Sequence, residues 1–197
     1  MLMTRDYVRE SGYHPDEKKL RDLLSQVTYE QKLNILQETK NRWVETALHE
    51  AARRGDAEMI TTILSSLQSE DRLKLLMLKE CRGCTPLQKA AHIGNTKSVK
   101  AILNSLTADH QMQLLTAEDE DGETAVESAS GKTADVLIRY SVNAIRRVKK
   151  GKIPTLLKLC VHHLAAQSYS VYIIMYYVLC QVNVNLCKWS NLFKLKL

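Results

Sequence analysis

The sequence predicts an all-α fold, a helical solenoid in which similar units stack side by side. A pattern of threonine, paired alanines and glycine starts at Thr46 and at Thr85, and a more worn copy without the alanine pair starts at Thr124. Both intervals between these threonines are 39 residues long, and equal spacing around one pattern identifies a repeat array. Arrays of this kind present extended surfaces, so we expect a binding protein and not an enzyme.

The array is expected to begin before the first threonine. Residues 20–36 hold the end of one helix and a further short helix, without the first half of a unit. We interpret residues 20–45 as an N-terminal cap, which covers the apolar face that the unit after Thr46 would otherwise expose to water. Residues 1–19, which precede the cap, are expected to be flexible.

Each unit is expected to open with a helix headed by its threonine. A threonine hydroxyl accepts hydrogen bonds from the free N–H groups of a first helical turn. Pro86 directly follows Thr85, at the helical position where a missing N–H costs nothing. The paired alanines allow two helices to approach closely. Gly55, Gly94 and Gly131 are expected to end these first helices, because a left-handed residue closes a helix there.

A second helix in each unit is predicted from apolar residues at helical spacing. In the two full units these residues are Ile60, Ile63 and Leu64, and Val99, Ile102 and Leu103. The third unit keeps Val136 but has Arg139 and Tyr140 at the other two positions. Such residues are expected in a terminal unit that faces solvent, so we place the end of the array at residue 140.

The repeated pattern resembles the ankyrin repeat, whose hallmark reads Gly-x-Thr-Pro-Leu-His-x-Ala-Ala-x-x-Gly. The copy that begins at Thr85 matches best, and the copy at Thr46 is second. The copy at Thr124 lacks two residues before its closing glycine. The resemblance covers residues 20–140 and implies, for each unit, a loop or hairpin followed by two antiparallel helices.

In the ankyrin family the motif residues are structural, and exposed surfaces bind other proteins. The resemblance assigns a structural role to Thr46, Leu48, His49, Gly55, Thr85, Pro86, Leu87, Gly94, Thr124 and Gly131. His49 stands at the histidine of the hallmark, which usually bonds locally and braces the loop. Ankyrin arrays bind partners with their loop tips and the exposed face of their first helices. The resemblance therefore implies an interaction scaffold or adaptor with another protein as its partner.

The units are longer than those of an ordinary ankyrin array. An ankyrin unit spans about 33 residues, whereas the interval here is 39. Residues 24–36, 64–76 and 103–115 align with one another and carry the additional length. Their shared pattern predicts a polar break and then a short extra helix, with acidic residues in its first turn that favour the helix dipole. These helices are expected to start within one residue of Thr28, Ser69 and Thr107.

Side chains at the tips and on the first helices are the predicted partner-binding residues. Trp43 is the principal candidate, because it occupies a tip and tryptophan is a frequent hot spot at interfaces. The alternative is that Trp43 folds back over the cap. The tips change from basic to acidic along the array, which predicts recognition of a partner by its charge pattern. The other predicted binding residues are Arg42, Arg53, Arg54, Arg82, Lys89, His92 and Asp119.

The sequence carries no motif for catalysis, a cofactor or a metal. It has neither a Gly-x-Ser-x-Gly nucleophile motif nor a glycine-rich phosphate loop. Cys81 and Cys84 form a C-x-x-C pair, but no second pair of ligands accompanies them, so we predict no metal site. The basic run at residues 146–152 is interpreted as a solvated helix end or a membrane flank, and nucleic-acid binding is not expected.

The composition changes near residue 136. The chain has 28 basic and 22 acidic residues, a net charge of +6, but no acid follows Asp135 and ten bases do. We therefore treat residues 141–197 as a separate, acid-free tail. Within it, the apolar residues 164–186 are long enough to span a membrane.

Three interpretations of the tail are open. In the first, residues 164–186 tether the array to a membrane on its cytoplasmic side, in an adaptor or in a fragment of a larger ankyrin-containing membrane protein. In the second, the tail is soluble and packs on the array or is partly disordered. In the third, it is a gene-model artefact. Five cysteines without disulfide spacing and a polar N-terminus without a secretory signal favour a cytoplasmic location.

Overall fold

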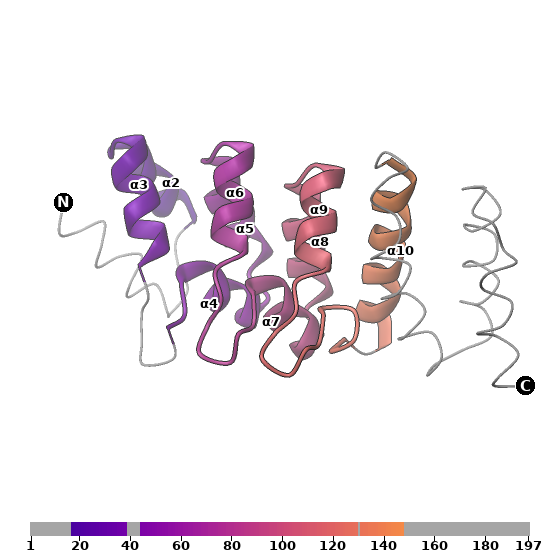
Figure 1. The fold of residues 1–197 in the computed structure, drawn as a ribbon. Helices are drawn as coiled ribbons and strands as arrows, with labels where there is room; N and C mark the ends of the chain where they lie inside the picture. The colour runs from indigo at the N-terminus through magenta and orange to yellow at the C-terminus, as the bar shows by residue number, and fades with distance from the viewer. Residues whose placement is uncertain (1–16, 39–43, 130, 148–197) are drawn as a thin grey trace, which may run out of the picture.

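The structure is a row of α-helices (Figure 1). It is a computed structural model that describes residues 17–38, 44–129 and 131–147. These residues contain no β-strand, only an isolated bridge between Glu118 and Thr124. The helices are α2 (Glu17–Ser25), α3 (Tyr29–Gln37), α4 (Ala47–Arg54), α5 (Ala57–Ser65), α6 (Ser69–Leu76), α7 (Pro86–Ile93), α8 (Thr96–Asn104), α9 (Ala108–Leu115) and α10 (Gly131–Arg147). The all-α solenoid prediction is confirmed.

Equivalent helices of successive units lie side by side. The first helices α4 and α7 pack on each other, as do the second helices α5 and α8. Figure 1 shows the extra helices α3, α6 and α9 as a separate row, with α2, α5 and α8 behind them. At one end α2 packs on α5, and at the other α10 packs on α8 and α9. Each unit therefore covers the next.

The first helices begin and end at residues suited to those positions. Thr46 and Thr85 are the N-caps of α4 and α7, and each forms a reciprocal capping box with the third residue of its helix. Gly55 and Gly94 close the two helices at φ values of 78° and 81°. Only glycine adopts this left-handed conformation without a steric penalty.

The third unit departs from the predicted pattern. Six residues separate Thr124 from Gly131, two fewer than the eight of α7, and the described ones form turns. The expectation that Gly131 ends a first helix is wrong, because Gly131 begins α10, with a φ of 53°. The physical reason is length, since a helix becomes stable only when several turns follow its costly first one.

Helix α10 runs past the predicted end of the array. The boundary at residue 140 lies inside this helix, which continues to Arg147. Leu137, Ser141 and Ala144 are fully buried, at the spacing of one helix face. The alignment of the repeats places Val136 and Tyr140 at the apolar-stripe positions of this helix. The face that is buried in the structure lies one residue further along the chain, at Leu137 and Ser141, because α10 starts at the glycine.

The extra helices start where the sequence predicts, and they tie neighbouring units together. Their N-caps are Thr28, Gln68 and Thr107. The Tyr29 hydroxyl, at the start of α3, donates to Asp71 Oδ2 at 2.6 Å. At the same positions one unit further on, Ser69 Oγ lies 3.4 Å from His110 Nδ1. The additional length therefore supplies packed and hydrogen-bonded structure.

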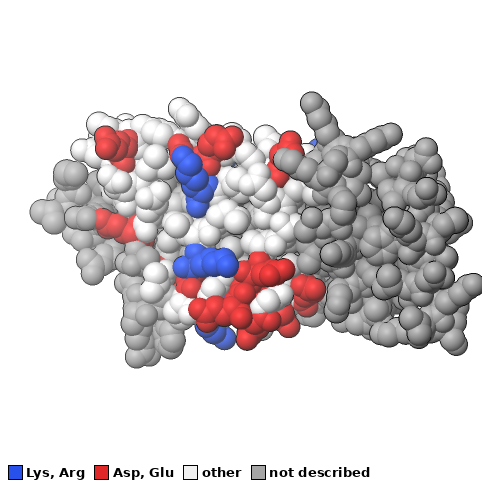
Figure 2. Space-filling view, in the orientation of Figure 1, with Lys and Arg blue, Asp and Glu red and all other residues white. Residues whose placement is uncertain are grey.

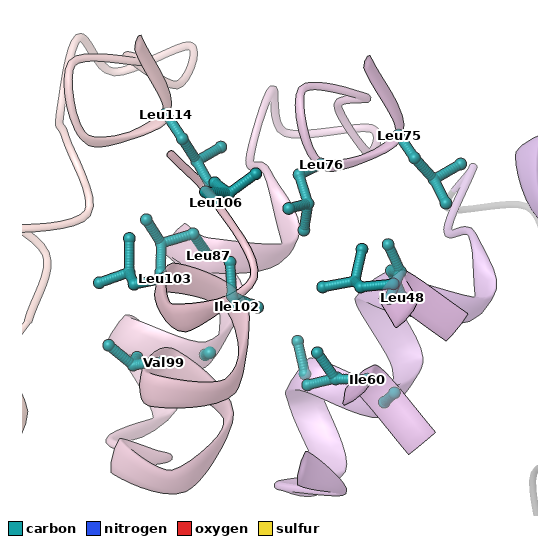
Figure 3. Close-up of a cluster of buried hydrophobic side chains, with 14 of the residues drawn as sticks. Leu48, Ile60, Leu75, Leu76, Leu87, Val99, Ile102, Leu103, Leu106 and Leu114 are labelled. Atoms are coloured by element: carbon teal, nitrogen blue, oxygen red, sulfur yellow. The ribbon is translucent and has the colours of Figure 1, made fainter. Parts of the chain in front are cut away.

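Apolar side chains of both full units fill the space between their helices. Figure 3 shows these side chains from the first, second and extra helices lying between the two units. Each is at most 8 % exposed, and burying one such side chain contributes about 1.5–3 kcal/mol. The labelled residues are Leu48, Ile60, Leu75, Leu76, Leu87, Val99, Ile102, Leu103, Leu106 and Leu114.

Several predictions fall outside the described residues. These are residues 1–16 of the segment 1–19 that was expected to be flexible, the tip residues Arg42 and Trp43, and the tail from residue 148, including the apolar residues 164–186. The last three residues of the segment 1–19 lie in α2. Among the helices that the structure describes, none is both long and apolar enough to cross a membrane.

Candidate protein-binding face

Two loop tips of the same design precede the second and third units. In the tip 79–84 the Glu80 N–H donates to the Cys84 carbonyl at 3.0 Å, and the Gly83 N–H donates to the Glu80 carbonyl at 2.9 Å. In the tip 118–123 the matching bonds join Asp119 to Glu123 at 3.0 Å and Gly122 to Asp119 at 3.2 Å. Each tip is thus a closed hairpin turn with a left-handed glycine.

The two tips contact each other closely. The Glu120 N–H donates to the Arg82 carbonyl at 3.3 Å, and Lys79 Nζ donates to the Glu118 carbonyl at 2.7 Å. A Cβ atom at Gly83 would lie only 2.8 Å from the backbone nitrogen of Glu120. The tips therefore form one continuous surface, which is ordered before any partner arrives.

The third residue of each first helix, His49 in α4 and Gln88 in α7, bonds the loop before its own helix to the following tip. His49 is fully buried, and its Nδ1 accepts from the Thr46 N–H at 3.2 Å. Its Nε2–H therefore donates to the Cys84 carbonyl, 3.1 Å away. Burial lowers the pKa of His49, which keeps the ring neutral. In the second unit Gln88 Nε2 donates to the carbonyls of Ala117 and Glu123.

A lysine and two carboxylates are buried together at the base of the tip 79–84. Lys89 Nζ, from α7, lies 2.8 Å from Glu45 Oε1 and 3.6 Å from Glu80 Oε2. The Glu45 and Glu80 side chains are 8 % and 2 % exposed. Lys89 is a predicted binding residue, but its side chain is only 16 % exposed and its charge is engaged in this cluster.

The other predicted binding residues are divided among α4, the tip 79–84 and α7. Arg53 and Arg54 are exposed at the end of α4, and both pair with Glu50, at 2.7 and 2.6 Å. Arg82 is exposed on the tip 79–84, and His92 is exposed in the last turn of α7. Of these side chains, Arg53 and Arg54 are brought together by Glu50.

Asp119 shapes its tip more than it presents charge. It is half-buried, and its Oδ1 accepts from the Asp121 N–H at 3.1 Å and from the Glu123 N–H at 2.9 Å. Glu80 was not among the residues that the sequence predicted to bind a partner. The acidic run was the available signal for this region.

Acidic side chains dominate the lower edge of this face (Figure 2), where Figure 1 places the loops before α7 and α10. Glu118, Glu120, Asp121 and Glu123 are exposed. None of the four makes an ion pair with a described residue.

The tip cysteines are poor nucleophiles. Cys81 and Cys84 are free thiols. Burial, with the nearby Glu80 and Asp119 carboxylates, raises the pKa of Cys84 to about 11. Desolvation and the Glu80 side chain also raise the pKa of Cys81. Both thiols therefore stay protonated at neutral pH. Across the described ranges, no group of three or more His, Cys, Asp or Glu residues is placed to hold a metal ion.

Comparison with known proteins agrees with this architecture. No curated protein matches the sequence. A chain in the crystal structure of the yeast ribosomal protein Rps3 in complex with its chaperone Yar1 is similar in fold, with a TM-score of 0.51 and 19 % identity. The match covers 69 % of this chain and 89 % of that one.

The family comparison is more direct. The model for ankyrin repeats in three copies matches residues 18–113 and again residues 48–147, which together take in more than half of the chain. Ankyrin-repeat proteins are generally modules for protein–protein interaction and generally not enzymes. The stacked units, their capping boxes and these matches lead to one conclusion: the chain belongs to the ankyrin-repeat family.

Proposed function

We propose that this protein is an interaction scaffold that holds a partner protein along its loop tips and the exposed face of its first helices. One observation carries the proposal: neighbouring tips are locked together by hydrogen bonds between them, while their exposed side chains differ from unit to unit. A preformed surface loses little conformational entropy on binding, which favours affinity.

The rest of the molecule is used to hold the array together. The second helices bury their apolar stripes against the next unit, and the extra helices bond to one another. Trp43 remains the principal anchor proposed from the sequence, since it belongs to the tip before the first unit.

Site-specific photo-cross-linking tests this function. A photoreactive amino acid is placed at Arg82 or His92, and in matched controls at Thr61 or Lys100, which are exposed on the second helices α5 and α8. We expect one common protein to be captured from the first two positions and not from the control positions. Equal capture from all four positions, or capture from the second helices alone, would contradict the proposal.

A variant at the predicted anchor supplies the second test. Trp43→Ala is expected to keep the thermal stability of the wild type and to weaken binding of the captured partner about tenfold or more, as for an interface hot spot. Unchanged affinity in a folded Trp43→Ala protein would remove Trp43 from the binding face.

A further inference from the structure

We infer that the partner presents a basic, arginine-containing segment, which docks across the tips 79–84 and 118–123 and directs one guanidinium group toward Glu80. The inference rests on the proposed function and specifies the chemistry of its partner. Two independent observations lead to it: a set of surface carboxylates without an ion pair to any described residue, and a buried carboxylate oxygen that lacks a donor.

The surface carboxylates belong to the tip 118–123. Glu118, Glu120, Asp121 and Glu123 are exposed within six residues and form no ion pair with a described residue. Lys79 Nζ bonds the Glu118 backbone carbonyl and not a side chain, and Arg82 contacts this tip through its backbone carbonyl. Like charges held this close produce a negative potential that attracts cations and repels nucleic acid. A basic polypeptide segment is the complementary partner.

The buried carboxylate is that of Glu80. Its side chain is 2 % exposed, and its Oε1 accepts no hydrogen bond. The other oxygen, Oε2, lies 3.3 Å from the Cys81 thiol and 3.6 Å from Lys89 Nζ. That lysine is closer to Glu45, at 2.8 Å. A buried charged oxygen without a donor destabilises the free protein, and an added donor removes that penalty.

Glu80 and the acidic tip face the same place. Cys84 Sγ lies 3.8 Å from Asp119 Oδ2, and both the Glu80 and Asp119 carboxylates act on this thiol. A group that enters beside Cys84 therefore meets both carboxylates. Because Oε1 is itself buried, the docking segment must displace a neighbouring side chain to reach it.

Arginine suits this position better than lysine. Its planar guanidinium carries five N–H donors and is only weakly hydrated, so it bonds two carboxylates at once with a small loss of hydration. A metal ion is a poorer candidate, since the described residues contain no group of three or more ligands placed to hold one.

Peptide binding to the full chain tests the inference. The probes are two short fluorescein-labelled peptides, in which arginine or lysine alternates with glycine and serine, and binding is followed by fluorescence anisotropy. We expect the arginine peptide to bind more tightly than the lysine peptide. Its affinity should fall about tenfold when salt shortens the Debye length from about 10 Å to about 3 Å. A wild-type protein that binds neither peptide would overturn the inference.

Two charge-matched variants locate the site. The tip variant is Glu118→Gln, Glu120→Gln, Asp121→Asn and Glu123→Gln, and the control is Asp22→Asn, Glu30→Gln, Glu58→Gln and Asp135→Asn, all exposed. We expect the tip variant to bind the arginine peptide about tenfold more weakly, and the control to bind within about twofold of the wild type. Equal losses in both variants would show attraction to net charge alone and would reject the site.

The isosteric Glu80→Gln variant tests the anchor. It is expected to abolish the preference for arginine over lysine while the protein keeps its helical circular dichroism spectrum. An unchanged preference would exclude Glu80 as the acceptor and overturn that part of the inference. A carbodiimide cross-link from a tip carboxylate to a lysine in residues 146–152 would assign the face to the protein's own tail, and would overturn a separate basic partner.

The two proposals fail in different ways. If photo-cross-linking captures a partner from the face while the arginine peptide does not bind, the scaffold function stands and the basic segment is wrong. If the peptide binds the tip but no protein is captured there, the basic chemistry stands and the scaffold function is contradicted.

Discussion

The second and third units start from the same motif but differ in what their third helical position does. In the second unit, Gln88 accepts from the Thr85 N–H at 2.8 Å and also donates forward to the Ala117 and Glu123 carbonyls, at 3.2 and 2.7 Å. In the third unit, Glu127 makes the same backward bond to the Thr124 N–H at 2.8 Å. An ionised glutamate has no donor, so it makes no forward bond.

This difference links local sequence to the length of the array. His49 in the first unit behaves like Gln88, since its Nε2–H reaches the Cys84 carbonyl in the next tip. Both units that are followed by a full tip thus have a donor at this position, and the unit in which the first helix is lost has only an acceptor. We therefore infer that the side chain at the third helical position, His49 or Gln88, couples one unit to the next.

The largest expected difference between the units lies in their packing. Leu87 and Val126 occupy the same motif position, 0 % and 3 % exposed. Leu87→Ala is expected to lower the free energy of unfolding by about 2–5 kcal/mol, because it leaves a cavity between two helices. Val126→Ala removes less surface from a turn and should cost about 1.5 kcal/mol. Urea denaturation followed by circular dichroism measures both, and equal losses would contradict the comparison.

Substitutions of the tip glycines are expected to give the next largest difference in stability between the units. Gly83 and Gly122 both have left-handed φ values, 72° and 78°, but only Gly83 has a neighbour where a Cβ would stand. Gly83→Ala is expected to cost about 2–4 kcal/mol from backbone strain and the clash with Glu120. Gly122→Ala should cost about 1–2 kcal/mol from strain alone. Thermal unfolding of both variants tests this, and a Gly83→Ala protein as stable as Gly122→Ala would refute the close contact of the tips.

Exchanging Gln88 and Glu127 between glutamine and glutamate is the most direct test of this difference between the second and third units. Gln88→Glu keeps the bond to Thr85 but removes both forward donors, so we expect a loss of about 2 kcal/mol from the unpaired carbonyls. The reciprocal Glu127→Gln should change the free energy of unfolding by less than about 0.5 kcal/mol. Hydrogen exchange of the tip 118–123 should rise in Gln88→Glu. If that tip stays equally protected, the forward bonds do not couple the units.

The parts of the fold that depend on local chemistry were predictable from the sequence. Equal spacing located the first and second helices of both full units, and the polar residues before each extra helix located its start to within one residue. These features follow from capping and helical periodicity, which involve residues a few positions apart.

Features that depend on distant packing were not predictable in the same way. Glu80 is buried beside Lys89 from α7, in a tip that contacts the tip 118–123, 39 positions further along the chain. Gly131 begins a helix because two residues are missing before it and α10 finds partners in α8 and α9. The charge of the acidic run was visible in the sequence, but its position beside Glu80 required the three-dimensional contact.

A small effect at neutral pH is expected from converting the first unit to the chemistry of the second. Gln at position 49 would keep both bonds, as Gln88 does, so His49→Gln should shift the free energy of unfolding by less than about 1 kcal/mol at pH 7.5. The difference should emerge on acidification. Burial lowers the pKa of His49 in the folded state, so below about pH 6.5 the unfolded chain binds more protons than the folded protein.

Stability from the neutral His49 is therefore fully present above about pH 6.5 and falls as the pH drops below that value, by at most about 1.4 kcal/mol per pH unit. Urea denaturation between about pH 5 and 7.5 should show this slope in the wild type and a flatter one in His49→Gln, while most carboxyl groups titrate at lower pH. His92→Gln, at an exposed position, is the control and should retain the wild-type slope. If His49→Gln keeps that slope as well, the buried histidine does not titrate as a neutral link, and the equivalence between His49 and Gln88 fails.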